Sequence, residues 1–117
     1  MGGTIHMPPK PIHYPPPKAV GGKIQEAEIV GRAMIKESFE NWGDYMRILD
    51  KIIWKKDGHI ELRFCQYYRK PNGGDLDWIF GQGAGHMHPK TLVKLIKKAK
   101  EKPDHGDFGD SLNGINV

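Results

Sequence analysis

The most constraining feature of this sequence is a period-two alternation of side chains over residues 45–56 and again over residues 60–70. Successive side chains of a β-strand point to opposite faces, so this alternation predicts two extended strands. Between them, Asp57 and Gly58 both tolerate a positive φ and suit a tight turn. The two segments are therefore predicted to form an antiparallel hairpin at the centre of the fold.

Further strands are predicted on both sides of this hairpin. Residues 71–74 (Pro-Asn-Gly-Gly) are a second turn signal, and residues 75–81 have the pattern of a third strand. Upstream, residues 24–36 fit either a strand or a helix, because their apolar positions match both periodicities. Their β-branched content and Gly31 favour a strand, and a helix is the alternative. We therefore predict an antiparallel meander of three to four strands.

Residues 89–102 carry the pattern of an amphipathic helix. Pro89 suits a first helical position, lysines gather towards the C-terminal end, and Pro103 ends the segment. The apolar stripe of this helix must bury against one face of the sheet, which leaves the other face open in the predicted arrangement. The stripe consists of Leu92, Leu95, Ile96 and Ala99, supported by Val93. The predicted fold class is thus α+β: an antiparallel β-meander covered on one face by a C-terminal amphipathic helix.

The sequence predicts one domain with a tail at each end. Residues 1–22 are rich in Pro and Gly, and proline keeps this stretch out of helices and central strands, so we expect disorder there. Residues 104–117 hold three aspartates, three glycines and few apolar residues, which predicts an acidic flexible tail. The domain itself spans residues 23–103. Residues 23–102 hold 16 Lys and Arg against 11 Asp and Glu, a net charge of +5 compared with +4 for the whole chain.

Composition excludes several classes of protein. The single cysteine, Cys65, rules out an internal disulfide and a multi-cysteine zinc site, and it fits a reducing compartment. No apolar run is long enough to span a bilayer, and the N-terminal region lacks the apolar core of a secretory signal. We expect an intracellular protein of the cytoplasm or nucleoid with no membrane partner.

Basic and aromatic residues recur along the predicted strands and turns. Lysine and arginine neutralise phosphates, and exposed aromatic rings stack on unpaired bases of any identity. A sheet face that carries both suits single-stranded DNA or RNA better than a duplex, which proteins usually read with a helix or ribbon in a groove. The predicted nucleic-acid-binding residues are Arg47, Lys51, Lys55, Lys56, Arg63, Tyr67, Arg69, Lys70 and Trp78. A solvated basic face with its aromatic side chains in the core is the alternative.

Two segments resemble the PC4-like family of transcriptional coactivators. They are IELRFCQYYRKPNG at residues 60–73 and HMHPKTLVKLI at residues 86–96, and the resemblance covers about residues 28–100. It implies a four-stranded antiparallel sheet with one helix, a homodimer formed through the helices, and single-stranded DNA binding on the sheets. The matching strand positions are Arg47, Lys51, Arg63, Tyr67 and Arg69. The family's lysine-glycine step before the helix is missing, since residues 81–85 contain no lysine.

Three other patterns indicate different chemistry. His86 and His88 alternate just before the helix, so both are candidate ligands for one metal ion, although His88 also suits a helix cap. The glycines of residues 81–85 lack the spacing and the lysine of a phosphate-binding loop. Cys65 lies mid-strand without an oriented base, and we identify no acid/base pair. We therefore expect a binding protein rather than an enzyme, with no cofactor; a small metal-binding protein using His86 and His88, or a protein-interaction adaptor, is the alternative.

Overall fold

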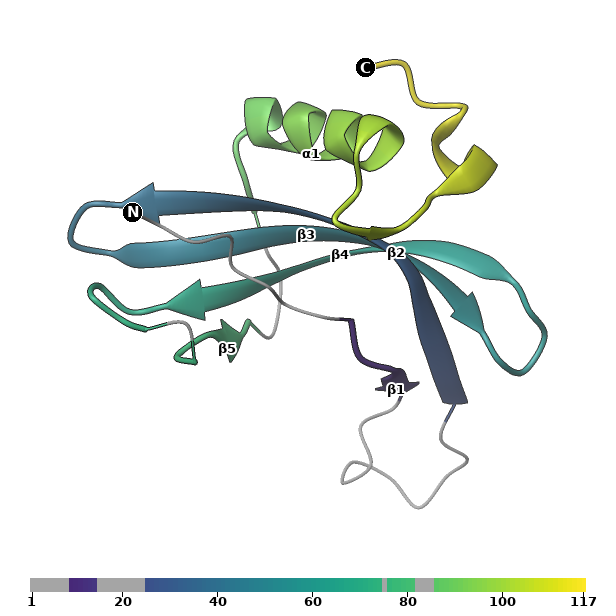
Figure 1. Cartoon of the computed structure of the whole chain (residues 1–117), viewed down its shortest axis with the longest axis horizontal. Coiled ribbons are helices and arrows are strands. Elements are labelled where there is room, and N and C mark those ends of the chain that lie inside the picture. The colour runs from purple at the N-terminus through teal and green to yellow at the C-terminus, as the bar shows by residue number, and fades with distance from the viewer. Residues whose placement is uncertain (1–8, 15–24, 75, 82–85) are drawn as a thin grey trace.

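A computed structural model describes residues 9–14, 25–74, 76–81 and 86–117 of the chain. Its strands are β1 (Ile12–Tyr14), β2 (Gln25–Phe39), β3 (Gly43–Trp54), β4 (Ile60–Arg69), β5 (Ile79–Phe80) and β6 (His105–Gly106). Its helices are α1 (Pro89–Glu101) and a short 3-10 helix, η1 (Gly109–Leu112). Together they form one antiparallel sheet with a helical layer on one side (Figure 1).

The strand order of the sheet is β1-β2-β3-β4-β5, and β6 pairs with β2. The predicted α+β class and the antiparallel meander covered by a helix are confirmed. Residues 24–36, for which strand and helix were both open, belong from Gln25 onward to strand β2. The strand predicted over 75–81 is reduced to the two residues of β5, which pair with Tyr67 and Tyr68.

The main core lies between α1 and the two longest strands. The helix packs on β2 and β3, and its apolar stripe buries Leu95, Ile96 and Ala99 as the sequence predicted. These side chains meet Ala33 of β2 and Leu49 of β3, both of which are fully buried. Burial of each large aliphatic side chain contributes about 1.5–3 kcal/mol, so this stripe fixes the helix on the sheet.

The C-terminal segment completes this core, whereas the sequence predicted a flexible tail from residue 104. Phe108 is 3% exposed and Leu112 is 1% exposed, and both pack in the cluster formed by the helix and the sheet. Gly31 of β2 lets the C-terminal segment lie close to this strand, because a Cβ at position 31 would lie 2.5 Å from the backbone oxygen of Asp107. The composition did not indicate this packing, since a few apolar residues anchor an otherwise polar, glycine-rich segment.

One acidic residue of this segment is also a structural anchor. Asp104 Oδ2 accepts a hydrogen bond from the backbone nitrogen of Met34 at 2.7 Å. Lys98 Nζ donates to Asp104 Oδ1 at 3.0 Å, and the backbone nitrogen of Asp104 donates to the oxygen of Arg32 at 2.7 Å. Asp104 therefore ties the end of α1 to β2.

The sheet face opposite α1 is covered in its central part, which corrects the prediction of an open second face. The indole of Trp78, in the segment before β5, packs on this face. The buried residues there are Met34, Met46 and Ile48, with Cys65, Tyr67 and Trp78 packed against them. The centre of this face is therefore packed, and beside it the exposed ring of Phe80 contacts Tyr67 edge to face.

A buried charge cluster lies on the same face. Asp50 is fully buried and accepts hydrogen bonds from Arg32 Nε at 2.7 Å and from Arg63 Nη2 at 2.9 Å. Buried charges are tolerated when hydrogen bonds satisfy them, and both oxygens of Asp50 accept such bonds here. Cys65 Sγ lies 3.8 Å from the Asp50 carboxylate, and burial raises the pKa of this thiol to about 11. The thiol is therefore neutral near pH 7.

The predicted N-terminal tail, residues 1–22, lies mostly outside the described residues. Its described part, residues 9–14, includes β1, in which Ile12 pairs with Ala27 of β2. Within the described ranges, no helix has the length and apolar character needed to cross a membrane.

Candidate nucleic-acid interface

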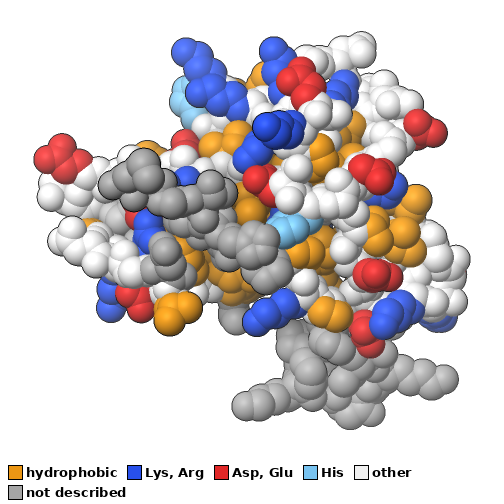
Figure 2. Space-filling model, viewed as in Figure 1, with side chains coloured by type: hydrophobic (Ala, Val, Ile, Leu, Met, Phe, Trp, Pro, Cys, Tyr) orange, Lys and Arg blue, Asp and Glu red, His pale blue; other side chains and the backbone are white. Residues whose placement is uncertain are grey.

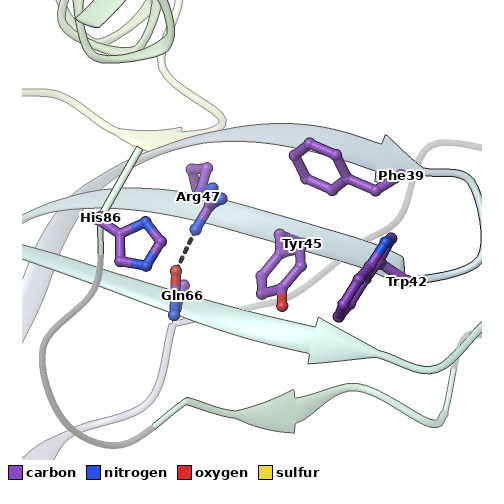
Figure 3. A pocket seen from close by; sticks show the side chains of 6 residues that line it. All are labelled: Phe39, Trp42, Tyr45, Arg47, Gln66 and His86. Atoms are coloured by element: carbon purple, nitrogen blue, oxygen red, sulfur yellow. Dashed lines mark hydrogen bonds between the residues drawn. The ribbon is translucent and has the colours of Figure 1, made fainter. Parts of the chain in front are cut away.

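An open pocket of about 380 Å³ lies on the α1 side of the sheet, at the end where β2 turns into β3. Its lining comes from the end of β2, the β2–β3 turn, β3, β4 and the segment before α1. The lining residues are Phe39, Trp42, Tyr45, Arg47, Gln66 and His86 (Figure 3). We call this hollow the aromatic pocket.

Three aromatic rings form one end of the aromatic pocket. The Phe39 and Tyr45 rings contact edge to face, with centroids 5.7 Å apart and planes at 77°. Tyr45 is supported from the other side by Tyr68, at 5.2 Å between centroids. Trp42 is 72% exposed, and its ring stands beside Tyr45 in Figure 3. A large exposed ring next to fixed rings is available to stack on a flat ligand.

The position of Trp42 is encoded by the turn that carries it. Its neighbours Asn41 and Gly43 have φ values of 69° and 101°, which asparagine and glycine tolerate better than other residues. A Cβ at position 43 would lie 2.2 Å from the backbone oxygen of Arg69, so only glycine lets the turn lie this close to the end of β4. These two positive-φ residues direct the indole between them towards the pocket.

A chain of hydrogen bonds fixes the polar side of the aromatic pocket. Thr91 Oγ1, in the first turn of α1, donates to Glu37 Oε2 at 3.0 Å. Glu37 Oε1 accepts from Arg47 Nε at 2.7 Å, and Arg47 Nη1 donates to Gln66 Oε1 (Figure 3). The Arg47 guanidinium also lies 4.6 Å from the centre of the Tyr45 ring. Arg47 is thus held in place with its charge balanced by Glu37.

This chain also orients Gln66. An arginine side chain can only donate hydrogen bonds, so Gln66 must present its amide oxygen to Arg47. The amide NH2 of Gln66 is then the group left to donate to other acceptors. Together with the imidazole of His86 and the aromatic rings, it makes a lining that suits a planar heterocycle with carbonyl or ring-nitrogen acceptors.

Of the nine residues predicted to bind nucleic acid, Arg47 alone lines the aromatic pocket. Lys51 lies on the same face, about 13 Å further along β3. It lines a separate hollow with Leu62 of β4 and Asp110 of η1. The sequence had placed both basic residues on one strand face, and that part of the prediction agrees with the register.

Two further predicted residues, Lys55 and Lys56, lie in the β3–β4 turn. Both are exposed. Lys55 Nζ lies 2.6 Å from Glu26 Oε1, and this hydrogen-bonded ion pair raises the pKa of the lysine. They lie at the opposite end of β3 from the aromatic pocket, so they do not belong to the same site.

The predicted single basic face is wrong, because Arg63, Tyr67 and Arg69 lie on the face opposite Arg47. The β3–β4 register pairs Arg47 with Gln66 and Asp50 with Arg63, which sets the two groups of basic residues on different faces. Arg63 binds the buried carboxylate of Asp50. Tyr67 packs in the apolar cluster on that face.

Arg69 and Trp78 stack on each other within the fold. The Arg69 guanidinium lies 4.5 Å from the centre of the Trp78 ring, and its Nη2 lies 2.6 Å from Asp44 Oδ2. Hydrogen bonds from the Ser38 hydroxyl and from Arg69 lower the pKa of Asp44. Arg69 is only 8% exposed, so it serves packing more than ligand contact. Lys70, the last of the predicted residues, is exposed just after β4.

His86 and His88, the alternative metal ligands, have separate surroundings. His88 is the N-cap of α1, where its Nδ1 accepts a hydrogen bond from the backbone nitrogen of Lys90 at 3.0 Å. His86 lines the aromatic pocket. In the described part of the chain, no three His, Cys, Asp or Glu side chains gather as a metal site would require.

Sequence reasoning did not assign Phe39, Glu37 and Gln66 to a site. Gln66 is a single polar residue within a strand, and Glu37 looks like a solvated charge until the α1 contact is known. Tyr45 and Arg47 are two positions apart in β3, and this spacing did indicate that their side chains share a face. The missing information was the register between strands.

Positive charge lies beside this site on α1. Basic side chains gather over the helix in Figure 2, and the basic residues of α1 itself are all lysines. Lys90 and Lys94, one turn apart, are exposed near the end of α1 that contacts Glu37 through Thr91. Comparison of the chain with protein-family models, curated proteins and solved structures found no match.

Proposed function

We propose that this protein binds single-stranded nucleic acid and takes one unpaired base into the aromatic pocket. The observation that carries the proposal is the pocket lining itself: an exposed Trp42 beside Tyr45 and Phe39, with the oriented amide of Gln66 next to them. Aromatic rings stack on the flat face of every base, and an amide donor matches the acceptors on base edges.

The pocket favours an unpaired strand over a duplex. In a duplex, both faces of a base are already stacked, so a base reaches a hollow of this kind only when it leaves the stack. The lysines of α1 supply the positive charge for the flanking phosphates, since Arg47 is already balanced by Glu37. This is a binding role that needs no catalytic group, and we assign none.

The proposal is tested by fluorescence anisotropy with labelled single-stranded DNA, the same sequence as RNA, and the matching duplex, each at two salt concentrations. We expect tighter binding to a single strand than to the duplex, and weaker binding at higher salt. Trp42→Ala should weaken single-strand binding about fivefold to 150-fold, which is the loss of affinity expected when one base loses its stacking partner.

The matched control is Trp54→Ala, which removes a second tryptophan from the far end of β3. It should leave single-strand affinity within about twofold of the unaltered chain. Negligible binding to all three probes would overturn the proposal. If Trp42→Ala and Trp54→Ala reduce single-strand affinity equally, the aromatic pocket is not the binding site.

A further inference from the structure

Among the described residues, no strand pairs with the outer edge of β4 over residues 60–65. The backbone nitrogen of Gly81 donates to the oxygen of Gln66 at 2.8 Å, so the carbonyl of Gln66 points away from β3. Backbone groups alternate in direction along a strand, so those of Ile60, Leu62 and Phe64 point the same way. Strand β5 pairs only with Tyr67 and Tyr68 (Figure 1), and within the described ranges no strand pairs with residues 60–65 on that side.

Apolar side chains accompany this free edge. Ile60 and Phe64 are 52% and 50% exposed, and both lie on the α1 side of the sheet, because Phe64 pairs with Leu49. The helix packs on β2 and β3 and leaves them in solvent. Proteins usually protect sheet edges with proline, bulges or charges, and residues 60–66 have no proline and no bulge against β3, so Glu61 and Arg63 are the protecting charges there. A partner strand is therefore the natural cover for this edge.

We propose that the β4 edge pairs with β4 of a second copy of this chain, antiparallel, about a two-fold axis at Leu62. This register sets Ile60 opposite Phe64 of the second copy and Glu61 opposite Arg63 of the second copy. The pairs at positions 60, 62 and 64 all have outward backbone groups, so the edge forms about six backbone hydrogen bonds. The strand is thus complementary to itself in backbone, apolar contact and charge.

Neighbouring registers are less favourable. A two-fold axis at Arg63 would set the two Arg63 side chains directly opposite each other, and an axis at Glu61 would do the same with two carboxylates. An axis at Phe64 would require the carbonyl of Gln66, which already accepts from Gly81. The axis at Leu62 avoids all three conflicts.

Both charged side chains are accessible for this contact. The Glu61 side chain is 54% exposed while its Oε1 accepts from Trp54 Nε1 and lies 3.4 Å from His59 Nε2, and Arg63 is 27% exposed while one of its nitrogens binds Asp50. An exposed ion pair contributes little affinity, but like charges in the other registers are repelled. The Glu61–Arg63 pairs therefore select the register, and the backbone and apolar contacts hold the two copies together.

The first test is the mass of the full chain in solution, measured by sedimentation over a range of concentrations. We expect a dimer for the unaltered chain. Phe64→Lys, and Glu61→Lys, which faces Arg63 of the second copy, should each raise the dissociation constant at least about tenfold. Glu28→Lys makes the same charge change at an exposed position of β2 and should leave the dimer unchanged. Circular dichroism and the thermal midpoint check that each variant is folded.

The second test fixes the register by oxidative cross-linking in a Cys65→Ala background. At the two-fold position, Leu62→Cys meets its own copy at a Cα separation of about 5.5 Å, which a disulfide spans. Ile60→Cys, the control, lies about 13 Å from its own copy and should not cross-link. A monomer at all concentrations would overturn the proposal, as would a dimer that resists both lysine variants or that cross-links through Ile60→Cys.

Discussion

Gln66 lies directly opposite Arg47 on the neighbouring strand, and its amide oxygen accepts a hydrogen bond from the Arg47 guanidinium. The contact connects the two central strands on the α1 side. It also extends, through Glu37 and Thr91, to the first turn of the helix. The polar side of the aromatic pocket and the first turn of α1 are therefore connected by one chain of hydrogen bonds.

Gln66→Glu tests this unit by changing charge with almost no change in shape. The new carboxylate keeps the contact with Arg47, so we expect the free energy of unfolding to be unchanged or slightly higher. It places a negative charge in the pocket, so single-strand affinity should fall about tenfold at low salt and recover partly at high salt. Anisotropy titrations measure this effect. Gln25→Glu, the same change at an exposed position of β2, should have little effect on single-strand affinity. If the two variants reduce this affinity equally, Gln66 has no specific role in binding.

The C-terminal segment should contribute strongly to stability. Phe108→Ala removes a buried aromatic side chain from the main core, so we expect the free energy of unfolding to fall by about 3–5 kcal/mol. Urea denaturation measures this change. Asp110→Ala, at an exposed position of η1, should change stability by less than about 0.5 kcal/mol. If both variants unfold at the same urea concentration as the unaltered chain, the segment does not belong to the core.

Loss of the Asp50 carboxylate should lower the free energy of unfolding strongly. Asp50→Ala removes a buried carboxylate that binds both Arg32 and Arg63, and breaking such a pair costs about 3–5 kcal/mol. The comparison variant is Glu40→Ala in the exposed β2–β3 turn, for which we expect a change near zero. Thermal or urea unfolding of the two variants distinguishes these outcomes, and similar midpoints would contradict the role of Asp50.

Cys65 should react slowly with thiol reagents in the folded protein. Burial raises its pKa from 9.0 to about 11, so the reactive thiolate is about a hundredfold scarcer at pH 8. Because folding raises this pKa, the folded state keeps its full stability below pH 9 and loses stability as the pH rises towards 11. Alkylation rates with and without urea measure the difference. Equal rates in the two conditions would show an accessible thiol.

The secondary structure was largely predictable because it depends on local patterns. Alternation along residues 45–56 and 60–70 identified the two strands, and β-branched residues favoured the strand that became β2. Pro89 marked the first residue of α1 correctly. These features depend on residues close together in the chain, which is why the sequence alone identified them.

The faces of the sheet were harder to predict, because they depend on how strands pair. Within each strand the alternation was correct, but the β3–β4 turn sets Ile53 opposite Ile60. Odd-numbered residues of β3 therefore share a face with even-numbered residues of β4. Arg47 consequently joins Gln66 instead of Tyr67 or Arg69, and the predicted basic surface is divided between two faces. Turn conformation decides this parity, and composition does not report it.

The aromatic pocket required contacts that are distant in sequence. Phe39 and Gln66 approach each other only through the sheet, and Glu37 gains its role from Thr91 on the helix. A similar limit applied to residues 104–117, whose packing depends on the absence of a side chain at Gly31. In both cases the sequence contained the residues, but only the three-dimensional arrangement connected them.

The packing of Phe108 and Leu112 has a consequence for synthesis. Both residues follow all the described strands and α1 in the chain, so the ribosome synthesises the sheet before the side chains that close its core. Until then Ala33 and Leu49 lie under an incomplete cover, and nascent chains expose apolar surface to their neighbours. Ribosome-bound chains that stop before Phe108 should accordingly depend on chaperones more than the released protein does.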